Sequence, residues 1–112
     1  MANIVRLKKR HRYIGFSLES NNIISKASFI NEIKTQCKIK LEQDSINIDL
    51  RLIKLDEKFG IIKCNHLQKE NVIKLLNSIK KIGNYDVTIH TIATSGTIRS
   101  LIKKYLKYTL KI

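Results

Sequence analysis

Apolar and polar residues alternate in four segments of the chain, and this alternation predicts strands with one face in a core. The first segment covers residues 11–18 and the second covers residues 48–53. The third, residues 59–65, follows the second after a short turn, so the two are expected to form a hairpin. The fourth covers residues 86–93. The pattern therefore predicts a sheet built from four strands.

Between and after these strands, apolar residues recur at intervals of three and four, which is the spacing of one face of a helix. Helix-capping residues stand at the ends of these stretches. The spacing predicts three helices: one capped by Ser25 and running to about residue 41, one over residues 67–82 and ended by Gly83-Asn84, and one capped by Ser95 or Thr94 and running to about residue 108.

The predicted order is strand, helix, strand, strand, helix, strand, helix. Its first six elements describe the split β-α-β unit of the ferredoxin-like fold, so we expect an α+β sandwich like the RNA-recognition motif, with an extra C-terminal helix. Residues 11–112 are expected to form this single domain, preceded by a basic arm at residues 1–10.

The last two predicted strands are partly apolar on both faces, so we expect the open face of the sheet to be partly covered. Either the last helix or a partner protein would provide this cover. The candidate surface for a protein partner comprises Tyr13, Phe59, Ile61 and Ile92.

The net charge of the chain indicates which class of molecule it binds. The chain has 22 Lys and Arg residues against 9 Asp and Glu, a formal net charge of +13. Such a field attracts polyanions, of which nucleic acid is the first candidate and an anionic membrane surface the second. No apolar run approaches the roughly 18 residues that a membrane span needs, and no signal-peptide core follows the basic start. We expect a cytoplasmic protein with no membrane partner.

Residues that could carry catalysis are scattered. The three histidines have no metal-ligand spacing with one another or with the cysteines, and no nucleophile elbow, P-loop or dinucleotide fingerprint occurs. Cys37 and Cys64 lie in apolar segments, as reduced core thiols do. We therefore expect no catalytic residue, no metal ligand and no cofactor bound by the chain itself.

The segment of residues 94–99 is the leading candidate for a binding site. Ser95 could cap the last helix, Gly96 would allow close approach, and Arg99 could add a charge-assisted contact. The free N–H groups of a first helical turn attract phosphate. An ordinary helix cap explains the same residues equally well, so the spacing alone leaves both interpretations open.

The last helix favours the phosphate interpretation, because its outward residues are basic and no acid stands among them. Too few aromatic residues fall on the central strands for base stacking, so we expect recognition of structured RNA through shape and phosphate. The predicted RNA-binding residues are Ser95, Gly96, Thr97, Arg99, Lys103, Lys104 and Lys107, with Arg6, Lys8, Lys9, Arg10 and Arg12 from the arm and first strand.

Three stretches, residues 12–16, 60–64 and 95–99, together resemble the ribonuclease P protein component 2 family, archaeal relatives of a small eukaryotic ribonuclease P and MRP subunit. The resemblance implies a fold like the RNA-recognition motif with added helices. It implies a complex that removes 5′ leaders from precursor tRNA, in which the RNA is the catalyst and uses Mg²⁺. It also implies that this protein binds ribonuclease P RNA and a partner called component 3, as a dimer of heterodimers.

The main alternative is a ribosomal or ribosome-associated protein that binds rRNA. Such proteins are also small and basic, so composition does not separate the two, and only the three matching stretches do. A DNA-binding module is disfavoured because no helix-turn-helix pattern occurs. An acylphosphatase-like hydrolase would need an arginine after the first strand, and residues 19–24 contain none.

Overall fold

The computed structural model describes residues 10–110, with side chains as far as Tyr105. It contains one antiparallel sheet with strand order β2-β3-β1-β5-β4. The elements are β1 (His11–Ser20), α1 (Lys26–Leu41), β2 (Arg51–Leu55), β3 (Phe59–Asn65), α2 (Lys69–Ser78), β4 (Lys81–Ile82), β5 (Tyr85–Ser95) and α3 (Ile98–Leu110).

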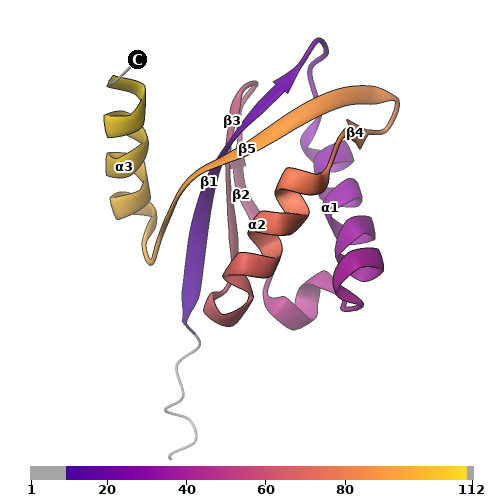
Figure 1. The fold of residues 1–112 in the computed structure, drawn as a ribbon, viewed down its shortest axis with the longest axis horizontal. Coiled ribbons are helices and arrows are strands. Elements are labelled where there is room, and N and C mark those ends of the chain that lie inside the picture. The colour runs from indigo at the N-terminus through magenta and orange to yellow at the C-terminus, as the bar shows by residue number, and fades with distance from the viewer. Residues whose placement is uncertain (1–9, 111–112) are drawn as a thin grey trace, which may run out of the picture.

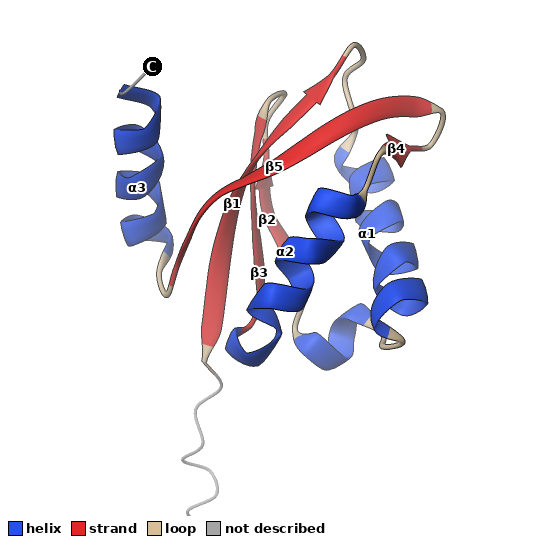
Figure 2. Ribbon diagram, in the orientation of Figure 1, coloured by secondary structure: helices blue, strands red, loops and turns tan. Residues whose placement is uncertain are grey.

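The sheet lies between two layers of helices. Figure 1 shows α1 and α2 together on one side and α3, in yellow, on the other. Figure 2, coloured by element type, shows the same three layers, with the sheet in red. The predicted α+β fold with an extra C-terminal helix is therefore confirmed.

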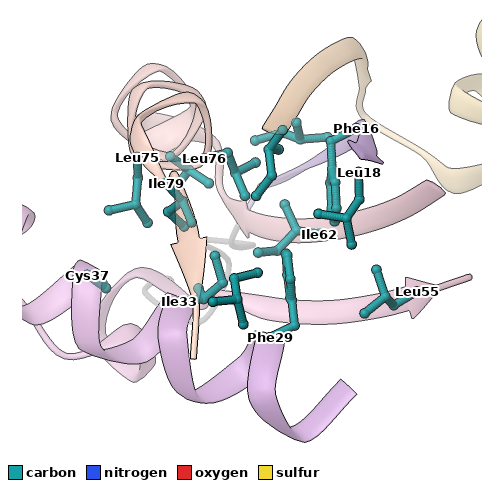
Figure 3. Packing of buried hydrophobic residues seen from close by; sticks show 14 of the residues in the cluster. Phe16, Leu18, Phe29, Ile33, Cys37, Leu55, Ile62, Leu75, Leu76 and Ile79 are labelled. Atoms are coloured by element: carbon teal, nitrogen blue, oxygen red, sulfur yellow. The ribbon is translucent and has the colours of Figure 1, made fainter. Parts of the chain in front are cut away.

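The main core fills the space between the sheet and the layer of α1 and α2. Alternate residues of β1, Ile14, Phe16 and Leu18, point into it and are at most 2% exposed, as the alternation predicts. The Phe16 ring stacks on Phe29 of α1 with centroids 5.3 Å apart (Figure 3). Opposite Phe16 in β3 stands Gly60, where an added Cβ would lie only 2.3 Å from Phe16 Cζ.

Helix α1 begins where the sequence predicts. Ser25 is the N-cap, and its side-chain oxygen accepts a hydrogen bond from the Ser28 backbone N–H at 3.1 Å. The helix ends at Leu41, followed by Glu42 in the left-handed region with φ 54°. The predicted cap and end of this helix are both confirmed.

The second helix is shorter than predicted, and the prediction for residues 79–82 was wrong. Helix α2 ends at Ser78, and Lys81–Ile82 forms the short strand β4 paired with β5. Ile82 pairs with Tyr85, so Gly83 and Asn84 form a two-residue hairpin loop in which Gly83 has φ 63°. The prediction was wrong because it rested on the spacing of apolar residues. Ile82 can be buried in the core from a strand as well as from a helix.

Other boundaries also differ from the predictions. A short 3₁₀ helix covers Ser45–Ile48, and Asp49 turns the chain with φ 54°, so β2 begins only at Arg51. At the C-terminal end, β5 continues to Ser95, and the capping hydroxyl of α3 belongs to Thr97 rather than to Ser95 or Thr94.

Candidate nucleic-acid interface

The turn between β5 and α3 is held by its own hydroxyl groups. Thr97 Oγ1 accepts a hydrogen bond from the Ser100 backbone N–H at 3.1 Å, as an N-cap does. Ser95 Oγ accepts one from the Thr97 backbone N–H at 3.4 Å. Both predicted binding hydroxyls therefore fix the shape of the turn, so a ligand here would meet a rigid backbone.

Arg12 of β1 lies against this turn although it is far away in sequence. The β1–β5 register sets Tyr13 opposite Ser95, which brings the preceding Arg12 beside Gly96. A Cβ added at Gly96 would be 3.4 Å from Arg12 Nη1. The guanidinium also donates to the His11 carbonyl at 3.3 Å. The structure thus brings together two of the predicted RNA-binding residues, the cation of Arg12 and the unobstructed backbone of Gly96.

The basic residues of α3 differ in how freely they present their charge. Arg99 and Lys103 are exposed and form no ion pair with the described part of the chain. Lys104 is also exposed, but its Nζ donates to the Thr94 carbonyl at 2.7 Å and so ties α3 to the end of β5. Lys107 belongs to α3, and its side chain lies outside the described residues.

The basic arm is described only at its last residue. Arg10 is exposed, and its carbonyl accepts a hydrogen bond from the His66 backbone N–H at 3.0 Å, which fixes the chain just before β1. Arg6, Lys8 and Lys9 lie outside the described residues.

Helix α3 covers the second face of the sheet. The sequence had left two possible covers for this face, the last helix or a partner protein. Leu101 is fully buried, and a Cβ at Gly15 of β1 would lie 3.4 Å from its Cδ1. The Tyr105 ring contacts the Phe59 ring of β3 with centroids 4.0 Å apart. Ile61 is 2% exposed and lies outside the main core cluster. The cover over this part of the sheet is therefore the chain's own last helix.

This cover revises the predicted protein-partner surface. Ile61 is buried and Phe59 packs against Tyr105, so neither offers a free surface while α3 is in place. Tyr13 and Ile92 are half-buried. The exposed large hydrophobic residues include Ile53 of β2 and Ile102 of α3, at 37% and 44% exposure. Alternation along a strand does not reveal which element covers its second face, so the assignment of Tyr13 and Ile92 to a partner stays a prediction.

Acidic residues gather at the opposite end of β1. A surface hollow there is lined by Glu19, Glu57 and Asp86 together with one cation, Lys58. Asp86 also pairs with Lys81 at 3.9 Å. Among the described residues, this end of β1 is therefore more acidic than the turn near its start.

The described residues offer no metal centre, since no group of three or more His, Cys, Asp or Glu side chains comes together among them. Burial raises the pKa of the Cys64 thiol to about 11, although the nearby Lys69 ammonium acts in the other direction. Burial also raises the pKa of Cys37, with a further contribution from Asp44. Neither thiol is therefore a thiolate nucleophile near neutral pH.

No helix within residues 10–110 is long and apolar enough to cross a membrane.

The sequence matches the model of the Rpp14/Pop5 family over residues 12–106. The chain belongs to the Rpp14/Pop5 family. Similar proteins include the ribonuclease P protein component 2 of Pyrococcus furiosus, 32% identical over 103 residues that cover 89% of this chain and 86% of that protein. The protein of the same name from Methanothermobacter thermautotrophicus is 30% identical over 115 residues, covering 94% and 92%.

A solved structure supports the fold of this Rpp14/Pop5 member. A chain in the cryo-EM structure of yeast ribonuclease MRP superposes with a TM-score of 0.62 at 14% identity, covering 93% of this chain and 94% of that one. The family resemblance expected from the sequence is confirmed by the family match over residues 12–106, and the solved structure supports the fold.

The three stretches that carry the Rpp14/Pop5 resemblance come together in the fold. Residues 12–16 of β1 pair with residues 60–64 of β3 over their whole length, from Arg12 opposite Cys64 to Phe16 opposite Gly60. The third stretch, residues 95–99, begins opposite Tyr13. They form one continuous region at the centre of the sheet, which extends to the start of α3.

Sequence reasoning missed two basic residues of this region. Lys63 of β3 stands opposite Tyr13, and Arg51 of β2 stands opposite Lys63 on its other side. Their proximity depends on strand register between distant segments, and no local sequence pattern reports it.

Proposed function

We propose that this chain is a protein subunit of ribonuclease P that binds and stabilises the catalytic RNA, and so supports removal of 5′ leaders from precursor tRNA. The family match over residues 12–106 carries the proposal. The relatives named ribonuclease P protein component 2 support it, since they align with nine-tenths of this chain or close to it. The comparisons do not favour the ribosomal alternative.

In this function the RNA carries out hydrolysis with Mg²⁺, and the chain contributes no catalytic group. Its part is to place cations against phosphates that would otherwise repel one another when the RNA folds compactly. Arg12, Arg99 and Lys103 are the described side chains best placed for this, around a turn whose backbone is held rigid by Thr97. Such contacts supply affinity and position rather than sequence discrimination.

The proposal extends to partners. We expect component 3 of ribonuclease P to bind this chain, in a dimer of heterodimers, and the complex to work in the cytoplasm. Ile92, a half-buried member of the predicted partner surface, remains a candidate for that contact.

Reconstitution tests the function directly. The chain and its cognate component 3 would be added to ribonuclease P RNA, and cleavage of precursor tRNA measured at limiting Mg²⁺. Stimulation that requires both proteins is expected, because protein cations replace part of the Mg²⁺ that the RNA needs to fold. Tight binding to ribosomal RNA without any stimulation would instead favour the ribosomal alternative.

The double variant Arg99→Ala with Lys103→Ala is expected to bind ribonuclease P RNA about tenfold more weakly near 0.15 M salt. The slope of log affinity against log salt should flatten by about 1.5, because two phosphate contacts are lost. Both side chains are exposed, so the free energy of unfolding should stay within about 0.5 kcal/mol of wild type.

The matched control is Lys34→Ala with Lys74→Ala, which removes two exposed charges from α1 and α2 on the other side of the sheet. It should leave the slope nearly unchanged. Equal slopes in both double variants would remove Arg99 and Lys103 from the interface.

A further inference from the structure

Four residues form a row across four neighbouring strands. Arg51 of β2 stands opposite Lys63 of β3, Lys63 stands opposite Tyr13 of β1, and Tyr13 stands opposite Ser95 of β5. Strands lie about 4.8 Å apart, so the row spans roughly 14 Å. It begins with two cations and ends at the turn before α3.

The row lies on the face of the sheet that α3 covers. Residues directly opposite one another on paired strands share a face, and so do residues two apart on one strand. Tyr13 is two residues from Gly15. The side chain of Leu101 of α3 lies over Gly15, in the space that a larger residue there would occupy. Lys63 is two residues from Ile61, which is buried outside the main core. The row is therefore the first one beyond the part of the sheet that α3 buries.

The side chains of the row are accessible. Arg51 is exposed, whereas Lys63, Tyr13 and Ser95 are half-buried. Half-burial along a strand leaves the end of a long lysine side chain in solvent while its methylene groups cover the sheet. The row thus presents charge at the surface and not inside the protein.

Arg51 and Lys63 place like charges directly opposite each other in the sheet. Like charges directly opposite on antiparallel strands destabilise a sheet. Neither residue has an ion-pair partner among residues 10–110, although Lys54 of the same hairpin pairs with Asp56 at 3.6 Å. A sheet that needed only stability would place an acid or a threonine opposite Arg51. A bound polyanion removes the repulsion.

We propose that Arg51, Lys63, Tyr13 and Ser95 form a track that binds the phosphodiester backbone of RNA. The inference rests on the proposed function and extends its interface from α3 onto the sheet. Arg51 offers a planar fork that matches a phosphate, and Lys63 offers a mobile ammonium. Tyr13 and Ser95 add hydroxyl groups that lead to the Arg12–Gly96 contact.

The track is continuous with the basic turn, and this continuity favours RNA over an acidic protein surface. Arg12 lies against Gly96 at the β5 end of the row, and Arg99 and Lys103 follow on α3. Cations predominate along the path, and the acid next to it, Asp49, is paired with His11 at 3.8 Å. An excess of cations along one path is the electrostatic footprint of a site for a nucleic-acid backbone. Backbone contacts along it would fix the register of the RNA without reading its sequence.

The test is the double variant Arg51→Gln with Lys63→Gln in the full chain, measured against ribonuclease P RNA. We expect binding about tenfold weaker near 0.15 M salt and a salt slope flatter by about 1.5. The free energy of unfolding should be unchanged or higher, because the repulsion between opposite charges is gone. The control is Lys34→Gln with Lys74→Gln, for which less than about a twofold loss is expected.

Chemical protection gives a second readout that needs no substitution. In the RNA complex, an amine-modifying reagent should label Lys63 at least several-fold more slowly than in the free protein, whereas Lys34 should react equally in both. Protection of Lys63 by component 3 alone, with none from RNA, would assign the row to a protein partner and overturn the track.

The remaining outcomes separate this inference from the proposed function. A wild-type protein that binds ribonuclease P RNA, with an unchanged slope in the Arg51 and Lys63 variant, overturns the track and leaves the function standing. A wild-type protein that binds only ribosomal RNA overturns the function, and the track then stands if the variant flattens the slope on that RNA. Absence of binding to either RNA overturns both.

Discussion

Replacing Gly60 by alanine is expected to lower the free energy of unfolding by about 3 kcal/mol, the upper part of the range for overpacked cores. The added Cβ would lie 2.3 Å from Phe16 Cζ and within 2.9 Å of two other ring atoms. Phe16 cannot move aside, because it is fully buried and stacked on Phe29. Denaturation with urea, followed by circular dichroism, measures the loss.

Gly15→Ala is the matched control, since Gly15 stands on the same sheet and its new Cβ would meet only the end of the Leu101 side chain at 3.4 Å. A cost below about 1 kcal/mol is expected there. Combining Gly60→Ala with Phe16→Leu should restore part of the stability that Gly60→Ala loses, because leucine lacks the ring atoms that clash. Equal losses at Gly60 and Gly15 would contradict the steric account.

Leu101→Ala is expected to weaken the docking of α3 on the sheet by about 2–3 kcal/mol. Leu101 is fully buried and fills the space that Gly15 leaves open, and Tyr105 one turn later contacts Phe59. Helix α3 is a layer by itself on its side of the sheet, so the loss should appear as local opening. Amide hydrogen exchange in α3 should therefore accelerate about thirtyfold or more, while α2 keeps its protection.

The neighbouring Ile102→Ala serves as the comparison, because Ile102 is 44% exposed on the same helix. Its substitution should change α3 exchange by only about threefold. RNA binding should weaken in the Leu101 variant as well, since α3 positions Arg99 and Lys103. Faster exchange spread evenly over α2 and α3 would show that α3 does not open separately and would contradict the local account.

Local pattern determined much of this fold. The alternation in β1 and the Ser25 cap of α1 are properties of neighbouring residues, and both appear as predicted. The end of α2 is different, because Ile79 and Ile82 are buried whether the chain between them is helical or extended. The hairpin that Gly83 permits decided the outcome. Only tertiary packing could separate the two possibilities.

The candidate interface was also predictable only where it depends on residues that are neighbours in the sequence. The turn at Gly96 and the exposed side chains of Arg99 and Lys103 belong to one segment, and their pattern indicated a polyanion site. Arg51 and Lys63 carry no such pattern, and they reach the same face only through the β2–β3–β1 register. Burial of Ile61 likewise followed from where α3 docks, which no strand pattern specifies.

The acidic hollow lined by Glu19, Glu57 and Asp86 affects how the protein meets its partner. Three acids line this hollow beside one cation, Lys58, whereas Arg12, Arg99 and Lys103 surround the Gly96 turn without an acid among them. A polyanion is repelled by the acids and attracted by the turn before contact, so diffusional encounters are biased toward the Gly96 turn. Fewer collisions are then wasted on the wrong orientation, and the association rate constant rises most at low ionic strength.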